Sequence, residues 1–190
     1  LIYDGTIMTG PRIWLFDTTL SDRARTRGVD FTVSDEQFIV SALDDFGIDY
    51  IEGGWPGANP TDDALFSKTQ NLRHAALVAF GMTRRGGRSV ENDPGLNAIF
   101  QAKADATCLV GKTWDFHVTT ALNIDLDENL QMIRDSVAAA KDRQFESMFD
   151  CEHFFDGFKA NRDFALSCVK AAAEGGAEWV ILCDTNGGTL

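Results

Sequence analysis

Residues 150–184 read DCEHFFDGFKANRDFALSCVKAAAEGGAEWVILCD, and this stretch holds one complete repeat of an α/β fold. A helix is predicted to begin after Asn161, a residue type that caps helices, and to end at Gly175. Between them, apolar residues recur at helical spacing: Phe164, Ala165, Cys168, Val169 and Ala172. The apolar run at residues 179–183 then predicts a buried strand that ends at Asp184.

The same alternation runs through the rest of the chain. Apolar runs at residues 13–16, 48–51, 75–80, 106–110 and 145–149 predict five further strands. A Ser-Asp-Glu-Gln capping box at residues 34–37 predicts a helix that Gly47 ends, and residues 125–128 open another. Six β/α units predict a parallel sheet with right-handed crossovers. Periodicity alone leaves two architectures open, a (β/α)₈ barrel and an open doubly wound sheet.

Composition narrows the class of protein. A chain of 190 residues can form one domain with a sizeable core, and its net charge of −12 argues against sequence-independent binding of nucleic acid. Its apolar runs are too short for a membrane span, so we expect no membrane partner. The four cysteines are widely spaced and predict buried free thiols in a reducing, cytoplasmic compartment. Because the chain starts at Leu1 and stops just after a motif, we expect a partial chain.

Polar residues follow the predicted strands, where both candidate architectures place their sites. Carboxylates, hydroxyls, imidazoles and cations gathered at one rim suit metal-assisted or acid–base chemistry on an anionic substrate. The alternative is that each strand-end residue only caps the helix that follows it. These groups are Asp17-Thr18-Thr19, Glu52, Thr83-Arg84-Arg85, Gly111-Lys112, residues 150–153 and Asp184-Thr185-Asn186. The glycine clusters match no dinucleotide or nucleotide-phosphate loop.

Six stretches resemble the citramalate-synthase branch of the citramalate and 2-isopropylmalate synthase family. They read DTTLSDRARTRGVDF, LDDFGIDYIEGGWPGANPTD, LVAFGMTRR, GKTWDFHVTTAL, DCEHFFDGFKAN and LCDTNGGTL, in the family's order. The resemblance implies a TIM (β/α)₈ barrel that is incomplete, with strands 1–6 of 8 in a single partial catalytic domain over residues 1–190. It also implies a divalent metal (Mg, Mn or Zn), acetyl-CoA and a 2-oxo acid, typically pyruvate, and a homodimeric parent.

The resemblance also assigns roles to residues. Asp22 occupies the position of the family's metal-ligating aspartate, and a hard cation needs such carboxylate oxygen. Glu152, Glu52 and His117 are the expected catalytic residues, with Glu152 as an acid–base or orienting group and His117 near the acyl donor. The expected substrate-binding residues are Thr185, Asp17 and Thr83.

Two departures from the family pattern qualify this reading. The family's DTTLRDGAQ is DTTLSDRAR here, so Ser21 replaces the arginine that steadies the enolate oxyanion, and arginines stand at positions 23 and 25. Arg23 or Arg25 could turn toward the site, although Arg23 is expected to crowd the loop. The family's His-x-His metal ligands would lie beyond Leu190. The alternatives are therefore an aldol-cleaving lyase of the same barrel type and a catalytically impaired barrel.

Overall fold

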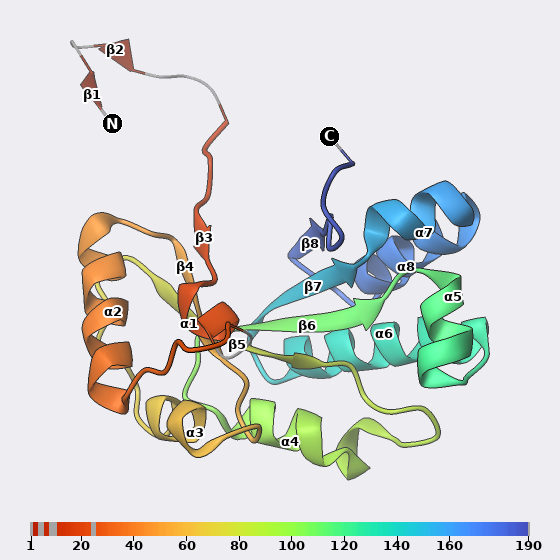
Figure 1. Cartoon of the computed structure of the whole chain (residues 1–190), viewed down its shortest axis with the longest axis horizontal. Helices are drawn as coiled ribbons and strands as arrows, with labels where there is room; N and C mark the ends of the chain where they lie inside the picture. The colour runs from red at the N-terminus through yellow and green to blue at the C-terminus, as the bar shows by residue number, and fades with distance from the viewer. Residues whose placement is uncertain (1, 4–5, 8–10, 24–25, 190) are drawn as a thin grey trace.

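A curled, six-stranded parallel sheet forms the centre of the computed structural model, which describes residues 2–3, 6–7, 11–23 and 26–189 (Figure 1). The strands lie in chain order, β3-β4-β5-β6-β7-β8. Their bounds are β3 (Phe16–Asp17), β4 (Tyr50–Gly54), β5 (Ala76–Met82), β6 (Ala106–Lys112), β7 (Glu146–Glu152) and β8 (Trp179–Leu182). A separate antiparallel pair joins β1 (Ile2–Tyr3) to β2 (Thr6–Ile7). The prediction of strands 1–6 of an incomplete barrel is confirmed.

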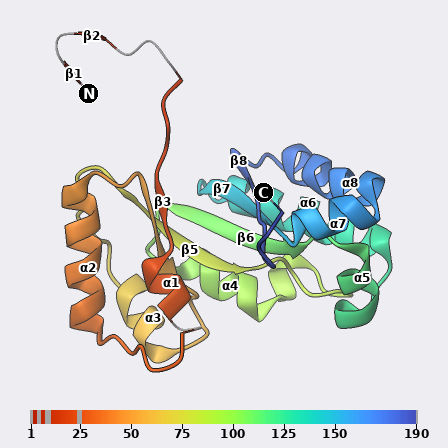
Figure 2. The same ribbon diagram turned by 45° about the horizontal axis from the view of Figure 1, so that its top comes forward.

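The larger helices cover the outer, convex side of the sheet (Figures 1 and 2). These are α2 (Val33–Phe46), α3 (Pro60–Phe66), α4 (Pro94–Gln101), α6 (Leu126–Asp142) and α8 (Arg162–Glu174). Shorter helices follow the carboxyl ends of the strands, namely α1 (Thr19–Arg23), η1 (Val90–Asn92), α5 (Asp115–His117), η2 (Val118–Leu122) and α7 (Phe154–Ala160). Within the described residues, none of these helices is both long and apolar enough to cross a bilayer.

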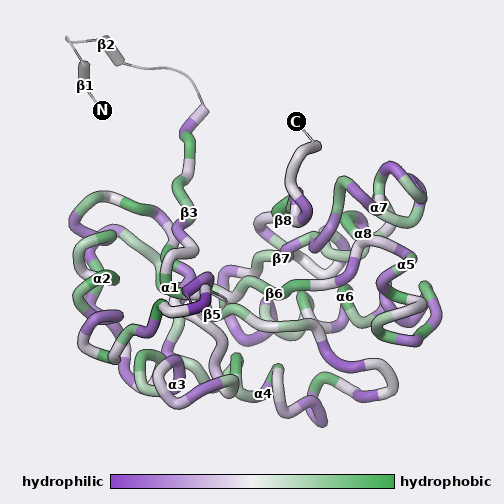
Figure 3. Tube along the Cα trace, in the orientation of Figure 1, coloured by the Kyte–Doolittle hydropathy of each residue, from purple (hydrophilic) through white to green (hydrophobic). Residues whose placement is uncertain are grey.

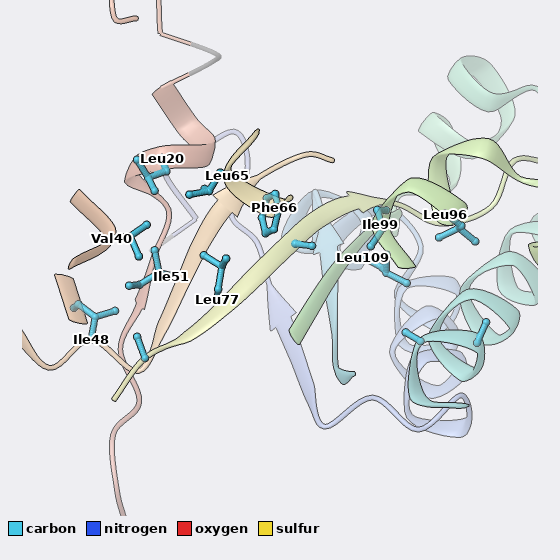
Figure 4. Packing of buried hydrophobic residues seen from close by; sticks show 14 of the residues in the cluster. Leu20, Val40, Ile48, Ile51, Leu65, Phe66, Leu77, Leu96, Ile99 and Leu109 are labelled. Carbon is cyan, nitrogen blue, oxygen red and sulfur yellow. The ribbon is translucent and has the colours of Figure 1, made fainter. Parts of the chain in front are cut away.

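Strand alternation separates the core from the inner face of the sheet. In β6, Leu109 points outward into the cluster that β4, β5, α2, α3 and α4 form, which Figure 4 shows from close by. Cys108 and Val110 point inward instead, against Tyr50, Phe80 and Met148. The trace of β6 is accordingly apolar along most of its length (Figure 3), and the strand ends at Lys112. Period-two alternation thus directs one set of side chains to the helices and the other into the barrel.

Two predicted helix ends are confirmed and one helix start is corrected. Gly47 ends α2 in the left-handed conformation at φ 89°, and Asn161 caps α8 by accepting from the Phe164 N–H. The capping box lies two residues earlier than predicted. Thr32, not Ser34, is the N-cap, because Thr32 Oγ1 accepts from the Asp35 N–H while the Asp35 carboxylate accepts from the Thr32 N–H at 2.8 Å.

The two edge strands depart most from expectation. The run at residues 13–16 was expected to form a strand, yet β3 begins only at Phe16 and Ile13 is 82% exposed. Residues 179–183 were expected to form a buried strand, but in β8 Leu182 is 46% exposed. Both strands have a neighbour on only one side in the described sheet, so their apolar side chains are only partly covered.

Candidate active site

The concave face of the sheet encloses a cavity of about 960 Å³. Its lining combines aromatic side chains, among them Trp14, Tyr50 and Trp179 near the start of the strands, with polar side chains near the carboxyl ends. Four of the predicted site residues line this one cavity: Asp22, Glu52, Glu152 and Thr185. They come from the segments after β3 and β8, from the middle of β4 and from the end of β7, on the side of the carboxyl rim of a barrel.

The described lining of the cavity is rich in acidic side chains. Its described lining holds five carboxylates and one cation, Lys112. The carboxylates are Asp22, Glu52, Asp150, Glu152 and Asp184. Sequence reasoning placed Asp150, Asp184 and Lys112 at strand ends but assigned them no role in the site. Strand alternation could have placed Lys112 in the site. Alternate residues of a strand face the same side, and Lys112 follows Cys108 and Val110 at this spacing, so it faces inward as they do.

Lys112 and Glu152 form an ion pair at the end of two neighbouring strands. They are direct partners in the β6–β7 register, and Lys112 Nζ donates to Glu152 Oε2. The Glu152 main chain is also held, because its carbonyl accepts from Thr113 Oγ1 at 2.7 Å. The two side chains keep 19% and 28% of their surface exposed, so the pair is partly buried in the cavity wall.

Asp22 and Asp17 play different structural parts despite their proximity in sequence. Asp22 lines the cavity, and its Oδ2 accepts from Thr18 Oγ1 at 2.8 Å. Asp17 instead accepts from the Thr19 N–H at 3.0 Å and from Thr19 Oγ1 at 3.1 Å, and these bonds hold the turn that leads into α1. Thr83 is buried at the end of β5 and donates its main-chain N–H to Val110 at 3.2 Å. Neither Asp17 nor Thr83 belongs to the cavity lining.

The oxygen-rich lining suits a hard divalent cation, which prefers carboxylate ligands. Asp22 at the rim and Glu52, which is only 4% exposed, belong to that lining. Over residues 11–23 and 26–189, however, no three His, Cys, Asp or Glu side chains stand together as a ready-made ligand set. The lining thus offers carboxylate oxygens of the kind that a divalent metal takes, Asp22 and Glu52 among them, but no complete ligand set within these residues.

His117 lies beside the cavity rather than in its lining. Its ring packs between Trp114, 4.7 Å away, and His153, 4.6 Å away and perpendicular. Burial, with the neighbouring His153 and Lys112, lowers the pKa of His117, so the ring is neutral at neutral pH. His153 in turn contacts Asp156 through Nδ1 at 3.1 Å, and its main-chain N–H donates to Thr185 Oγ1 at 2.8 Å. This cluster links the segment after β7 to the segment after β8.

Arg23 does not approach the cavity, contrary to both expectations for it. Its guanidinium ion-pairs with Glu36 of α2 and with Asp62 of α3, and all three side chains are buried. Asp62 also accepts from the Trp55 N–H at 2.8 Å. Arg23 thus neither replaces the arginine absent at Ser21 nor crowds the ligand. Arg25 lies outside the described residues.

The prediction of free thiols is confirmed for all four cysteines. Cys108, Cys151 and Cys168 are buried, and Cys183 is half-buried at the cavity wall. Burial raises the pKa of every one of these thiols, to about 12 for Cys168. None is therefore an activated nucleophile in this environment.

The sheet and its acidic inner cavity define a β/α-barrel protein with a site at the carboxyl ends of its strands. The model of the HMGL-like family matches residues 12–190, and the chain belongs to that family.

Individual proteins extend the comparison. The chain is 49% identical over 181 residues to the (R)-citramalate synthase of Aquifex aeolicus (strain VF5), covering 94% of this chain and 34% of that protein. It is 32% identical to a probable 2-isopropylmalate synthase of Methanopyrus kandleri, covering 93% of this chain and 33% of that protein. The chain thus spans about one third of the length of these relatives. A crystal structure of hydroxymethylglutaryl-CoA lyase from Pseudomonas aeruginosa shares the fold, with a TM-score of 0.69 at 16% identity over 91% of this chain and 58% of that chain.

Proposed function

We propose that the protein to which this chain belongs condenses acetyl-CoA with a 2-oxo acid, with pyruvate as the acceptor and citramalate as the product. The observation that carries the proposal is the 49% identity to a citramalate synthase, which runs over 94% of the chain. The lower identity of 32% to the 2-isopropylmalate synthase favours the smaller acceptor.

The acidic cavity supports a reaction that begins with removal of a proton. A base takes a proton from the acetyl methyl group, the resulting enolate carbon bonds to the oxo carbon of pyruvate, and hydrolysis of the thioester releases CoA and the dicarboxylic acid. Glu152 is the proposed acid–base group, because its side chain reaches the cavity while its main chain is held by Thr113. Glu52 is the second carboxylate of the site, from the buried strand β4.

Thr185 is suited to hold the substrate carboxylate. Its Oγ1 accepts from the His153 N–H, which directs the hydroxyl hydrogen away from His153. Asp22 is the proposed residue of this chain that holds a divalent metal. When bound, such a metal polarises the oxo carbonyl. His117 is neutral and packs against Trp114, so it is proposed to border the acyl-donor side rather than to carry charge.

The test is an assay of the full-length parent with acetyl-CoA and pyruvate, following free thiol release and identifying the product by chiral chromatography. We expect citramalate, loss of activity on chelation of divalent metal, and a fall of at least about a hundredfold in the Glu152→Gln variant. Glu174→Gln, on the exposed end of α8, is the matched control. Preference for a larger branched 2-oxo acid, or cleavage of a hydroxymethylglutaryl thioester without any condensation, would refute the proposal.

A further inference from the structure

Two sequence motifs meet at the carboxyl rim of the sheet. EHFFDG, residues 152–157, spans the end of β7 and the start of α7, and CDTNGGT, residues 183–189, follows β8. Each motif supplies one residue to the cavity lining that the proposed function uses, Glu152 from the first and Thr185 from the second. Other polar residues of the two motifs bond to one another across the rim.

Asp156 is the centre of this contact between the motifs. One oxygen of its carboxylate, Oδ2, lies 3.1 Å from His153 Nδ1 and accepts from Asn186 Nδ2 at 3.0 Å. The side chains of Asp156 and His153 keep 25% and 15% of their surface exposed, so water competes less for these bonds than it does on an open surface. Asp156 thus ties its own helix to the loop that follows β8.

His153 connects the two site residues through its main chain. It directly follows Glu152 and adopts the left-handed conformation at φ 54°, which is uncommon for residues other than glycine and must be held by the surrounding structure. In this conformation its N–H donates to Thr185 Oγ1 at 2.8 Å. Its ring contacts Asp156 and packs against the perpendicular ring of His117. The orientation of the Thr185 hydroxyl therefore depends on Asp156.

The loop after β8 requires side-chain contacts of this kind. In the described sheet β8 has β7 as its one neighbour, and Thr185 and Asn186 are both exposed. The Cys183 N–H still bonds to the Cys151 carbonyl of β7, at a long 3.4 Å. Besides the bonds to His153 and Asp156, an exposed bond joins Lys159 of α7 to Thr189 at 3.2 Å. The position of Thr185 thus depends on contacts with α7 and with the residue that precedes it.

We propose that Asp156 is a positioning residue of the site. Through His153 and Asn186 it directs the Thr185 hydroxyl toward the cavity, where that hydroxyl donates to the carboxylate of the 2-oxo acid. The inference rests on the proposed function for the role of Thr185, and it deepens that function by naming the residue that orients this hydroxyl. Because Asp156 acts through one hydroxyl, its loss is expected to affect the 2-oxo acid more than acetyl-CoA.

The experiment measures kcat and KM of the full-length parent for pyruvate and for acetyl-CoA. In Asp156→Ala, the KM for pyruvate is expected to rise about tenfold, as for one lost hydrogen bond to a charged group, with little change in the KM for acetyl-CoA. Asp156→Asn, whose amide oxygen can still accept, should lie nearer the native value. Asp163→Ala is the matched control, because it removes an exposed aspartate from the first turn of α8 as Asp156→Ala removes one from the first turn of α7.

A double-mutant cycle separates positioning from a general loss of structure. If Asp156 acts through Thr185, then Asp156→Ala should raise the pyruvate KM by less than about twofold when it is added to Thr185→Val. Asn186→Ala tests the same contact from the exposed loop and leaves α7 intact, so it serves if Asp156→Ala does not fold. It should raise the pyruvate KM several-fold.

The inference is overturned by equal rises in the two KM values, by a full further loss in the Thr185→Val background, or by an unchanged pyruvate KM in Asp156→Ala and Asn186→Ala. Hydrogen exchange of the peptide over residues 183–189 gives a readout that needs no activity, and it should be faster in Asp156→Ala than in the native parent. If the native parent forms no citramalate while this exchange depends on Asp156, the proposed function fails and the contact stands. If citramalate forms and neither exchange nor the pyruvate KM depends on Asp156, the inference alone fails.

Discussion

The indole of Trp14 lies 5.8 Å from that of Trp179, centroid to centroid, with 65° between the ring planes. One indole precedes the first strand of the sheet and the other begins the last. Tyr50 contacts both rings, at 5.9 Å from Trp14 and 6.2 Å from Trp179. Side chains from the two edges of the sheet therefore meet in the cavity, near the start of the strands. This contact requires the sheet to curl, as the sheet of a barrel does.

Tyr50 is expected to make the stability of the fold depend on pH. Its hydroxyl donates to Glu146 at 2.6 Å, and burial followed by that hydrogen bond raises the pKa of Tyr50 from 10.0 to about 12. Because the folded state favours the protonated phenol, its contribution is complete below pH 10 and is lost as the pH rises through about 12. We expect the free energy of unfolding to fall by roughly 2–3 kcal/mol across this range. Urea unfolding at a series of pH values measures this free energy.

The small number of tyrosines in the chain makes a control for Tyr50 possible. Tyr3 and Tyr50 are its two tyrosines, so a Tyr3→Phe chain reports Tyr50 alone in a titration of tyrosinate absorbance. Tyr50→Phe should remove the Tyr50 part of the alkaline loss. A midpoint near 10 in the Tyr3→Phe chain would show that the Glu146 contact does not persist in solution.

Much of the fold was predictable because it depends on local patterns. Apolar runs indicated the six strands, with β3 displaced to Phe16–Asp17, and the shared rim placed Glu52 and Glu152 in one cavity. The direction of Arg23 was not predictable, because it depends on Glu36 and Asp62, which approach it only when α2 and α3 pack. The exposure of residues 179–182 likewise depends on which strands flank them. Long-range pairing, rather than residue type, decides these features.

Cys183 should respond to the charge of Asp150. Its thiol donates to Asp150 Oδ1 at 2.7 Å, and burial together with the Asp150 charge raises its pKa. Since the thiolate is the reactive form, we expect slow alkylation in the native chain and a several-fold faster reaction in Asp150→Asn. Mass spectrometry of peptides labelled with iodoacetamide identifies the site. Asp142→Asn, an exposed change of equal charge on α6, should leave the rate as it was, and an unchanged rate in Asp150→Asn would contradict the assignment.

Gly157 explains one position of the EHFFDG motif. A Cβ at this residue would lie 2.3 Å from the Thr113 carbonyl oxygen and 2.9 Å from the Trp114 Cα, so α7 packs directly on the main chain that follows β6. Gly157→Ala must push these segments apart, and we expect a loss of about 1–3 kcal/mol in thermal or urea unfolding. Gly95→Ala, where the added Cβ meets Asp93 Oδ1 at 3.2 Å, is the comparison and should cost less. Equal losses would mean that the close approach is not maintained.

Removal of Arg23 should lower the free energy of unfolding. Glu36 is fully buried and Asp62 nearly so, and deletion of the guanidinium leaves Glu36 without its ion-pair partner. Breaking a buried pair from one side typically costs about 3–5 kcal/mol. We expect a loss of that order for Arg23→Gly in urea unfolding, partly restored by Glu36→Gln. Arg73→Ala breaks the exposed pair with Asp45, whose side chains are 70% and 57% exposed, and should cost about 1 kcal/mol or less. Similar losses for the two variants would show that Arg23 is not committed to this buried pair.

The last prediction concerns Ser21 in the full-length parent. An oxyanion stabiliser is typically worth about a hundred- to thousandfold in turnover, and a serine hydroxyl supplies neither the charge nor the planar donors of a guanidinium. We therefore expect slow citramalate formation, and a partial gain in Ser21→Arg, since Ser21 is buried in α1 and a long side chain must find its way to the cavity. Because Arg23 is turned toward Glu36, adding Arg23→Gly should not release crowding; it should lower the active fraction by unpairing Glu36 and Asp62. The measurement is the rate of thiol release from acetyl-CoA with pyruvate in the parent, the single variant and the double variant. A double variant faster than Ser21→Arg would show that residue 23 obstructs the ligand. A parent that already turns over at about 1–10 per second would show that the arginine is dispensable here.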